Sequence, residues 1–134
     1  MLKFKYYHRN VLIDICSGIF RLLPNSATGK TFLCSILDDL RRAGHTGLYT
    51  FTYSDVLDGR SLNDFKDKEI SIIVVDRFDM YASMDNYKLL KTFADKGATV
   101  LVDMKHEDCE IYWDGVSSIY LKKDEIKVKV RRAE

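Results

Sequence analysis

The sequence of 134 residues has little of what marks secreted or membrane proteins. Its three cysteines, Cys16, Cys34 and Cys109, are far apart, odd in number and form no C-x-x-C pair. This spacing favours reduced thiols over a disulfide framework, and therefore a cytoplasmic protein. No apolar run approaches the roughly 18 residues of a membrane span. The first residues alternate in polarity, so we expect no signal peptide.

Net charge is also low. Lysine and arginine number 21 and aspartate and glutamate 20, which gives a formal charge of +1. No overall field therefore attracts the protein to nucleic acid or to a membrane, and any such binding needs a local patch. We expect no membrane partner.

The chain does have the length and apolar content of one globular domain. Apolar residues make up 46% and charged residues 31% of the sequence. A chain of this size buries roughly two-thirds of its unfolded surface, so it needs no disulfide or structural metal. We expect a single domain over residues 1–134, with a core at about 10–105 and a C-terminal β-hairpin extension at about 110–132.

Polarity patterns predict the order of strands and helices. Alternating or β-branched runs predict strands, and apolar residues at helical spacing predict helices. The expected strands are 2–8, 11–16, 19–23, 46–53, 70–75, 98–102 and 126–131, with a hairpin of 111–113 and 116–121 turning at Asp114-Gly115; the expected helices are 30–43, 62–67 and 85–96. The alternation in the middle predicts a parallel core sheet with antiparallel additions at both ends.

One stretch, Leu22 to Leu33, joins an apolar strand to an amphipathic helix. It contains Gly-Lys-Thr, the end of the phosphate-binding pattern G-x-x-x-x-G-K-[ST], with Pro24 in place of the first glycine. Backbone N–H groups at a helix N-terminus lack intrahelical partners and bind phosphate well. The sequence therefore predicts a phosphate-binding loop made of Asn25, Ser26, Ala27, Thr28, Gly29, Lys30 and Thr31.

Carboxylates follow two of the predicted strands. The hydroxyl of Thr31 and the carboxylate of Asp76, which ends strand 70–75, are the oxygen ligands we expect for Mg²⁺. Asp103 ends strand 98–102 and should lie on the same sheet edge. Asp76, Asp79 and Asp103 are therefore the candidate catalytic residues. The alternatives are a turn or cap residue for Asp79 and a solvated strand-end carboxylate for Asp103.

These motifs resemble those of the P-loop NTPases. Leu22 to Thr31 is similar to Walker A and Ile72 to Asp76 to Walker B, and residues 10–105 distantly resemble ATP-binding-cassette and RecA-like ATPase domains. The resemblance implies a three-layer α/β domain with a mostly parallel central sheet that binds ATP or GTP with Mg²⁺. Pro24 and Arg77 depart from the pattern, because Arg77 stands where a glutamate often follows the aspartate. We therefore expect slow or partner-dependent hydrolysis.

The predicted C-terminal hairpin is basic. Lys127, Lys129 and Arg131 alternate with valines, so they share one face. This face could bind nucleic acid or an acidic partner, or its lysines could protect an edge strand from pairing. The alternatives to a nucleotide-binding protein are an interaction module with a decayed site, which binds a protein or nucleic-acid partner, and a small-molecule phosphotransferase with an acceptor pocket in 54–69. For any of these functions, a protein partner and a homo-oligomer are both open alternatives.

Overall fold

The computed structural model describes residues 1–24, 27–106 and 111–133. The strands in this part of the chain are β1 (Leu2–Tyr6), β2 (Arg9–Ile13), β3 (Gly18–Leu22), β4 (Leu48–Phe51), β5 (Ile72–Val75), β6 (Thr99–Val102), β7 (Gly115–Leu121) and β8 (Glu125–Arg132). The helices are α1 (Ala27–Arg42), α2 (Tyr53–Leu57) and α3 (Met84–Asp95), with 3₁₀ turns η2 (Leu62–Phe65) and η3 (Phe78–Met80). The sequence pattern missed α2, whose ends are fixed by a capping box at Thr52.

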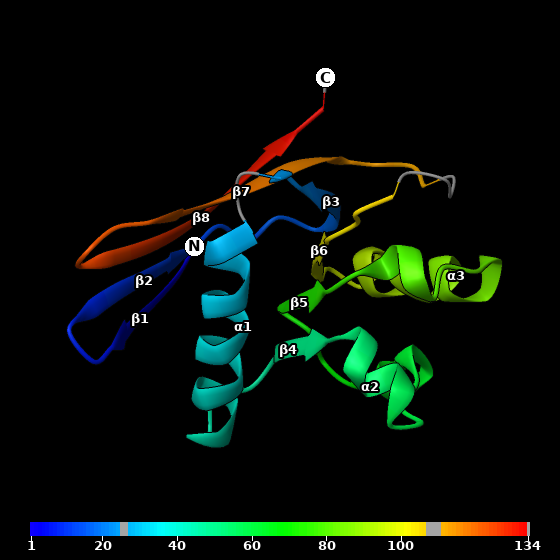
Figure 1. Cartoon of the computed structure of the whole chain (residues 1–134), viewed down its shortest axis with the longest axis horizontal. Coiled ribbons are helices and arrows are strands. Elements are labelled where there is room, and N and C mark those ends of the chain that lie inside the picture. Colours follow the sequence, from blue (N-terminus) through cyan, green and yellow to red (C-terminus); the bar gives the residue numbers. More distant parts are fainter. Residues whose placement is uncertain (25–26, 107–110, 134) are drawn as a thin grey trace.

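All eight strands form one mixed sheet in the order β1-β2-β8-β7-β3-β6-β5-β4. The neighbours from β7 to β4 are parallel, as are β2 and β8. The pairs β1/β2 and β7/β8, which lie toward one end of the sheet, are antiparallel. Figure 1 shows the sheet curling around α1 like half a barrel.

The predicted three-layer P-loop NTPase-like fold is wrong. The described chain has only three α-helices, of 16, 5 and 12 residues, and its curled mixed sheet is not the flat middle layer of a helix-rich domain. The cause is the last strand. β8 lies between β7 and β2, so the terminal strands extend the sheet instead of flanking it. Right-handed twist accumulated over eight strands then bends the sheet.

The predicted turn at Asp114-Gly115 is also wrong. Asp114 instead joins β3, because its N–H donates to the Ile19 carbonyl and its Oδ2 accepts from the Ile19 N–H, both at 2.8 Å. Gly115 begins β7, where an added Cβ would lie 2.0 Å from the Arg131 carbonyl oxygen. The hairpin therefore consists of β7 and β8 and turns after Leu121.

The two faces of the sheet carry separate apolar clusters. Leu33, Ile36, Leu37 and Leu40 of α1 pack in one cluster with strand residues that include Val11 and Val128. On the other face, Leu90 and Phe93 of α3 pack with residues that include Val100. Strands β5 and β6 are buried along their whole length between the two clusters, which fixes the positions of their carboxyl ends.

No helix in the described part of the chain is long and apolar enough to cross a membrane.

Candidate functional site

Strand pairing brings three distant segments to one edge of the sheet. Val75 of β5 and Val102 of β6 are partners in register, so Asp76 and Asp103 leave the sheet side by side. The Asp103 N–H donates to the Val75 carbonyl at 2.9 Å, which continues this pairing by one step. β3 lies beside β6, and α1 begins shortly after β3 ends. Lys30, in the first turn of α1, therefore faces both carboxylates.

Lys30 forms a charge cluster with Asp76 and Asp103. Its Nζ lies 2.6 Å from Asp76 Oδ1 and 2.9 Å from Asp103 Oδ2. The three side chains are only 16%, 24% and 22% exposed, so water screens these charges incompletely. Burial lowers the pKa of Lys30, but the hydrogen bonds and negative charges of Asp76 and Asp103 outweigh it and raise the pKa above its ordinary value. The cluster therefore has one cation and two carboxylates.

The rest of the predicted phosphate loop is only partly described. Asn25 and Ser26 lie outside the described residues, and Ala27 and Thr28 begin α1. Thr31 follows Lys30 in the helix and is exposed.

Gly29 has a packing role that the sequence analysis missed. It is buried against β7, where an added Cβ would lie 2.5 Å from Ile119 Cγ2. Glycine therefore allows the first turn of α1 to approach the sheet, whatever its role toward a ligand.

Asp79 is held apart from this cluster by an ion pair. Both of its oxygens accept hydrogen bonds of 3.2 Å from the Arg77 guanidinium, and Oδ1 also accepts the Lys105 N–H at 3.3 Å. The side chain is 2% exposed. Burial raises the pKa of Asp79, but these hydrogen bonds and the Arg77 charge together lower it by more. The pKa of Asp79 therefore lies below its ordinary value. This arrangement fits an anchor between η3 and the segment after β6.

The turn after Asp76 is held by two residues that sequence reasoning did not assign to it. Arg77 has a left-handed backbone (φ 50°, ψ 48°), which is rare for a side chain other than glycine or asparagine. Its N–H points to Asp103 Oδ2 at 3.4 Å. The Tyr81 hydroxyl donates to the Asp76 carbonyl oxygen at 2.5 Å. Burial and nearby carboxylates raise the pKa of Tyr81, so the hydroxyl keeps its proton.

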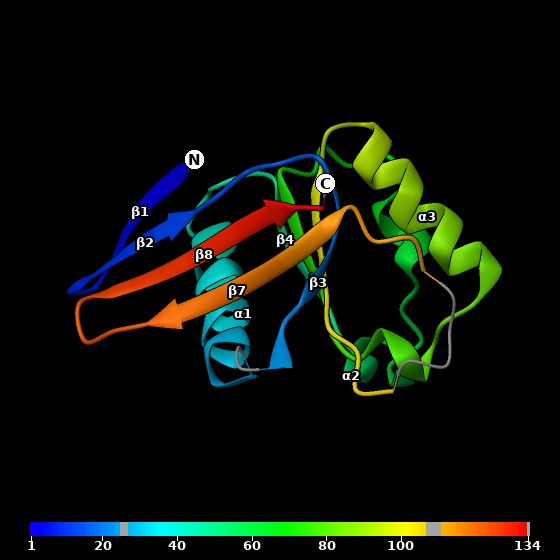
Figure 2. The same cartoon turned by 90° about the horizontal axis from the view of Figure 1, so that it is seen from above.

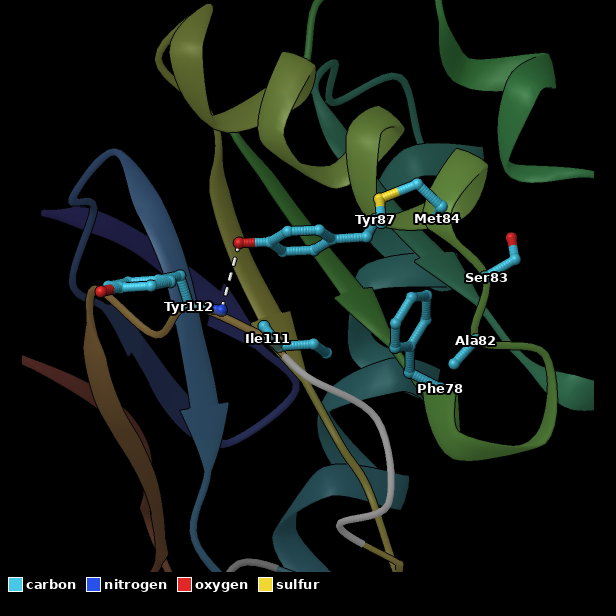
Figure 3. Close-up of a pocket in the computed structure, with 7 residues that line it drawn as sticks. All are labelled: Phe78, Ala82, Ser83, Met84, Tyr87, Ile111 and Tyr112. Carbon is cyan, nitrogen blue, oxygen red and sulfur yellow. Dashed lines mark hydrogen bonds between the residues drawn. The ribbon is translucent and has the colours of Figure 1, made fainter.

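An apolar pocket opens from the same β5–α3 connection. It has a volume of about 670 Å³ and is lined by Phe78, Ala82, Ser83, Met84, Tyr87, Ile111 and Tyr112. Figure 3 shows the Tyr87 ring reaching from α3 toward residues 111 and 112, and the Tyr112 N–H donates to the Tyr87 hydroxyl at 3.1 Å. Helical spacing alone placed Tyr87 on the apolar side of its helix and gave no signal for this pocket.

The chemistry of the cluster is compatible with magnesium and phosphate. Among residues 1–24, 27–106 and 111–133, no group of three or more His, Cys, Asp or Glu side chains could hold a metal ion alone. Mg²⁺, however, usually takes only one or two carboxylates and completes its octahedron with water and substrate phosphates. Asp76 provides one such carboxylate with Asp103 beside it, and Lys30 has a third ammonium hydrogen for an anion.

Comparisons with known proteins assign no family. No family model, curated protein or solved structure matches this chain.

Proposed function

We propose that the protein binds a nucleoside triphosphate, ATP or GTP, together with Mg²⁺ where Lys30, Asp76 and Asp103 meet, and that it hydrolyses the nucleotide slowly or only with a partner. The supporting observation is that one half-buried ammonium group bridges two strand-end carboxylates next to a helix N-terminus. A polyphosphate with its metal ion has the complementary charges.

Ligand binding would exchange partners within the cluster. Phosphate oxygens would take the Lys30 ammonium and the free N–H groups of the first turn of α1. Mg²⁺ would then sit against Asp76, with the Thr31 hydroxyl as the second protein ligand that we assign. The metal would neutralise phosphate charge. In this scheme the Lys30 ammonium bridges the two carboxylates until the ligand arrives.

Hydrolysis needs a group that orients water, and this requirement supports slow turnover. Phosphoryl transfer depends mainly on positioning and electrostatics, so a water-orienting group that is already engaged, as Asp103 is by Lys30, reduces the rate more than the affinity. Asp79 is committed to Arg77 and Lys105. Asp103 is therefore the residue we assign to orient water, with Asp76 on the metal.

Calorimetric titration and thermal unfolding with ATP or GTP, with and without Mg²⁺, test this proposal. At a nucleotide concentration a hundredfold above Kd, binding stabilises the folded state by about 2.7 kcal/mol, a rise in Tm of roughly 10 °C. Lys30→Ala should abolish the rise, whereas Lys91→Ala, an exposed lysine of α3, should keep it. Asp103→Asn should keep binding and lose turnover. Equal affinity in Lys30→Ala and wild type would refute the proposal.

The second candidate is an interaction module without nucleotide binding. Two sequence departures favour it, Pro24 at the entry of the loop and Arg77 directly after Asp76, whose guanidinium is tied to Asp79. This candidate predicts no nucleotide-dependent change in Tm in any of the proteins above. For either function we propose a cytoplasmic location, because Cys16 and Cys34 are both free thiols.

A further inference from the structure

The outer face of β1, β2, β8 and β7 is the side turned away from α1. Figure 2, seen from above, shows β7 and β8 crossing in front of α1 and β2 and β1 continuing the sheet to one side, with no helix in front of these four strands. On β8, Ile126 and Val128 are fully buried in the cluster beneath α1. Successive strand residues point to opposite faces, so Lys127 and Lys129 lie on the outer face.

The same alternation places the N-terminal lysines there. Leu2, Phe4 and Tyr6 of β1 pack against the cluster beneath α1, so Lys3 and Lys5 belong to the opposite face. The register then aligns both ends of the chain. One row across the four strands reads Lys3, Leu12, Lys127 and Tyr120. Lys129 and Arg131 follow on β8, opposite Ser118 and Val116.

Edge protection does not explain the lysines of β8. A lysine on an edge strand prevents further pairing, which accounts for Lys3 and Lys5 on β1. β8, however, has β2 on one side and β7 on the other, and Lys127 is paired with Leu12 and Tyr120. For Lys127, the structure therefore excludes edge protection, which the sequence had left open as an alternative to binding.

The charge of this face is not balanced internally. Within the described part of the chain, no carboxylate forms an ion pair with Lys3, Lys5, Lys127, Lys129 or Arg131. Acidic residues at this part of the sheet include Glu125, on the same face of β8, and Asp14, whose Oδ2 accepts the Val130 N–H at 3.1 Å. Five cations thus share a face with few carboxylates, although the whole chain has a net charge of only +1.

An exposed aromatic ring lies among these cations. Tyr120 is 46% exposed, and Lys129 Nζ lies 5.9 Å from the centre of its ring. Surfaces that bind single strands combine cations that follow the phosphates with aromatic rings on which bases stack. In a duplex the bases already stack on one another and are not available to an exposed ring such as Tyr120. The ring therefore favours a single strand over a duplex.

From this combination we propose that the outer face of β1, β2, β8 and β7 binds single-stranded nucleic acid. Lys3, Lys127 and Lys129 contact phosphates, and Tyr120 stacks on a base. The surface lies on the opposite side of the sheet from α1, so it does not depend on the nucleotide proposal.

Fluorescence anisotropy with a labelled oligothymidylate tests the proposal. The oligonucleotide should exceed the roughly 4–16 nucleotides that one small binding fold covers. The triple variant Lys3→Ala/Lys127→Ala/Lys129→Ala should bind at least tenfold more weakly. It should also flatten the slope of log K against log salt by about 2, because each phosphate contact contributes about 0.7 on a single strand. Tyr120→Leu should weaken binding about tenfold and leave the slope unchanged.

A matched control separates this face from general charge. Lys66→Ala/Lys88→Ala/Lys91→Ala removes the same charge from exposed lysines elsewhere and should bind as wild type does. Lys30→Ala should also retain oligonucleotide binding, which distinguishes this proposal from the nucleotide site. Equal losses in the two triple variants would overturn the proposal. So would an unaffected Tyr120→Leu, or binding only to duplex DNA or to vesicles containing phosphatidylserine.

Discussion

Charged side chains are distributed differently in the two halves of the sheet. In the half made of β3, β6, β5 and β4, apolar clusters cover both faces, and Lys30 of α1 meets the carboxylates of Asp76 and Asp103 where β5 and β6 end. In the half made of β1, β2, β8 and β7, only one face is covered, and lysines project from the middle of strands. Paired charges at a buried edge fit a site for a small charged ligand, whereas unpaired charges across an open face fit an extended polyanion.

The largest expected difference between the halves is in stability. Leu101, in β6, is fully buried between the two covered faces, whereas Leu12, in β2, lies on the outer face. Leu101→Ala should lower the free energy of unfolding by about 2–5 kcal/mol, because it leaves a cavity. Leu12→Ala should cost less than about 1 kcal/mol, since its surroundings are open. Urea unfolding measures both, and equal losses would show that the outer face is packed against something.

A smaller effect is expected where α1 meets β7. Gly29→Ala should gain up to about 1 kcal/mol of helix propensity, but the new Cβ would lie 2.5 Å from Ile119 Cγ2. Overpacking of this kind costs about 1–3 kcal/mol, so we expect a net loss. In the double variant Gly29→Ala/Ile119→Ala, the two losses should be less than additive, because the second change removes the clash. Additive losses in urea unfolding would contradict this explanation.

The sequence predicts local elements better than it predicts their partners. The apolar run 72–75 identifies β5, and the rule that parallel strands end at one edge places Asp76 near Asp103. Both deductions use only neighbouring residues or a general rule of topology. The position of β8 between β7 and β2 depends on pairing between opposite ends of the chain, which polarity patterns do not encode. The overall fold was predicted wrongly for this reason.

The sequence also did not predict which side chains pair with each other within the turns. From the sequence, Arg77 was a departure that weakened a motif, and Asp79 was a candidate catalytic residue. The structure pairs them with each other, because the left-handed backbone of Arg77 turns its guanidinium toward Asp79. The spacing of Arg77 and Asp79 in the sequence does not show whether the two side chains form an ion pair or act separately. The functional assignments of Lys30, Asp76 and Asp103 remain predictions, which the nucleotide titrations above test.

The smallest of these effects concerns the anchor at Asp79, and it depends on pH. Asp79→Asn should cost about 1–2 kcal/mol at neutral pH, since it weakens charged hydrogen bonds of a buried group. The pKa of Asp79 is lower in the folded protein than in the unfolded chain, so its stabilising effect is present above the unfolded pKa of about 4 and is lost as the pH falls through the folded pKa. The difference between wild type and variant in urea unfolding should therefore be constant from pH 7 to about 5 and disappear on further acidification. Lys127→Ala, on the open half, should change stability by less than about 0.5 kcal/mol throughout. A difference for Asp79→Asn that persisted well below its folded pKa would mean that the carboxylate charge is not what holds the turn, and that the covered half is fixed by packing alone.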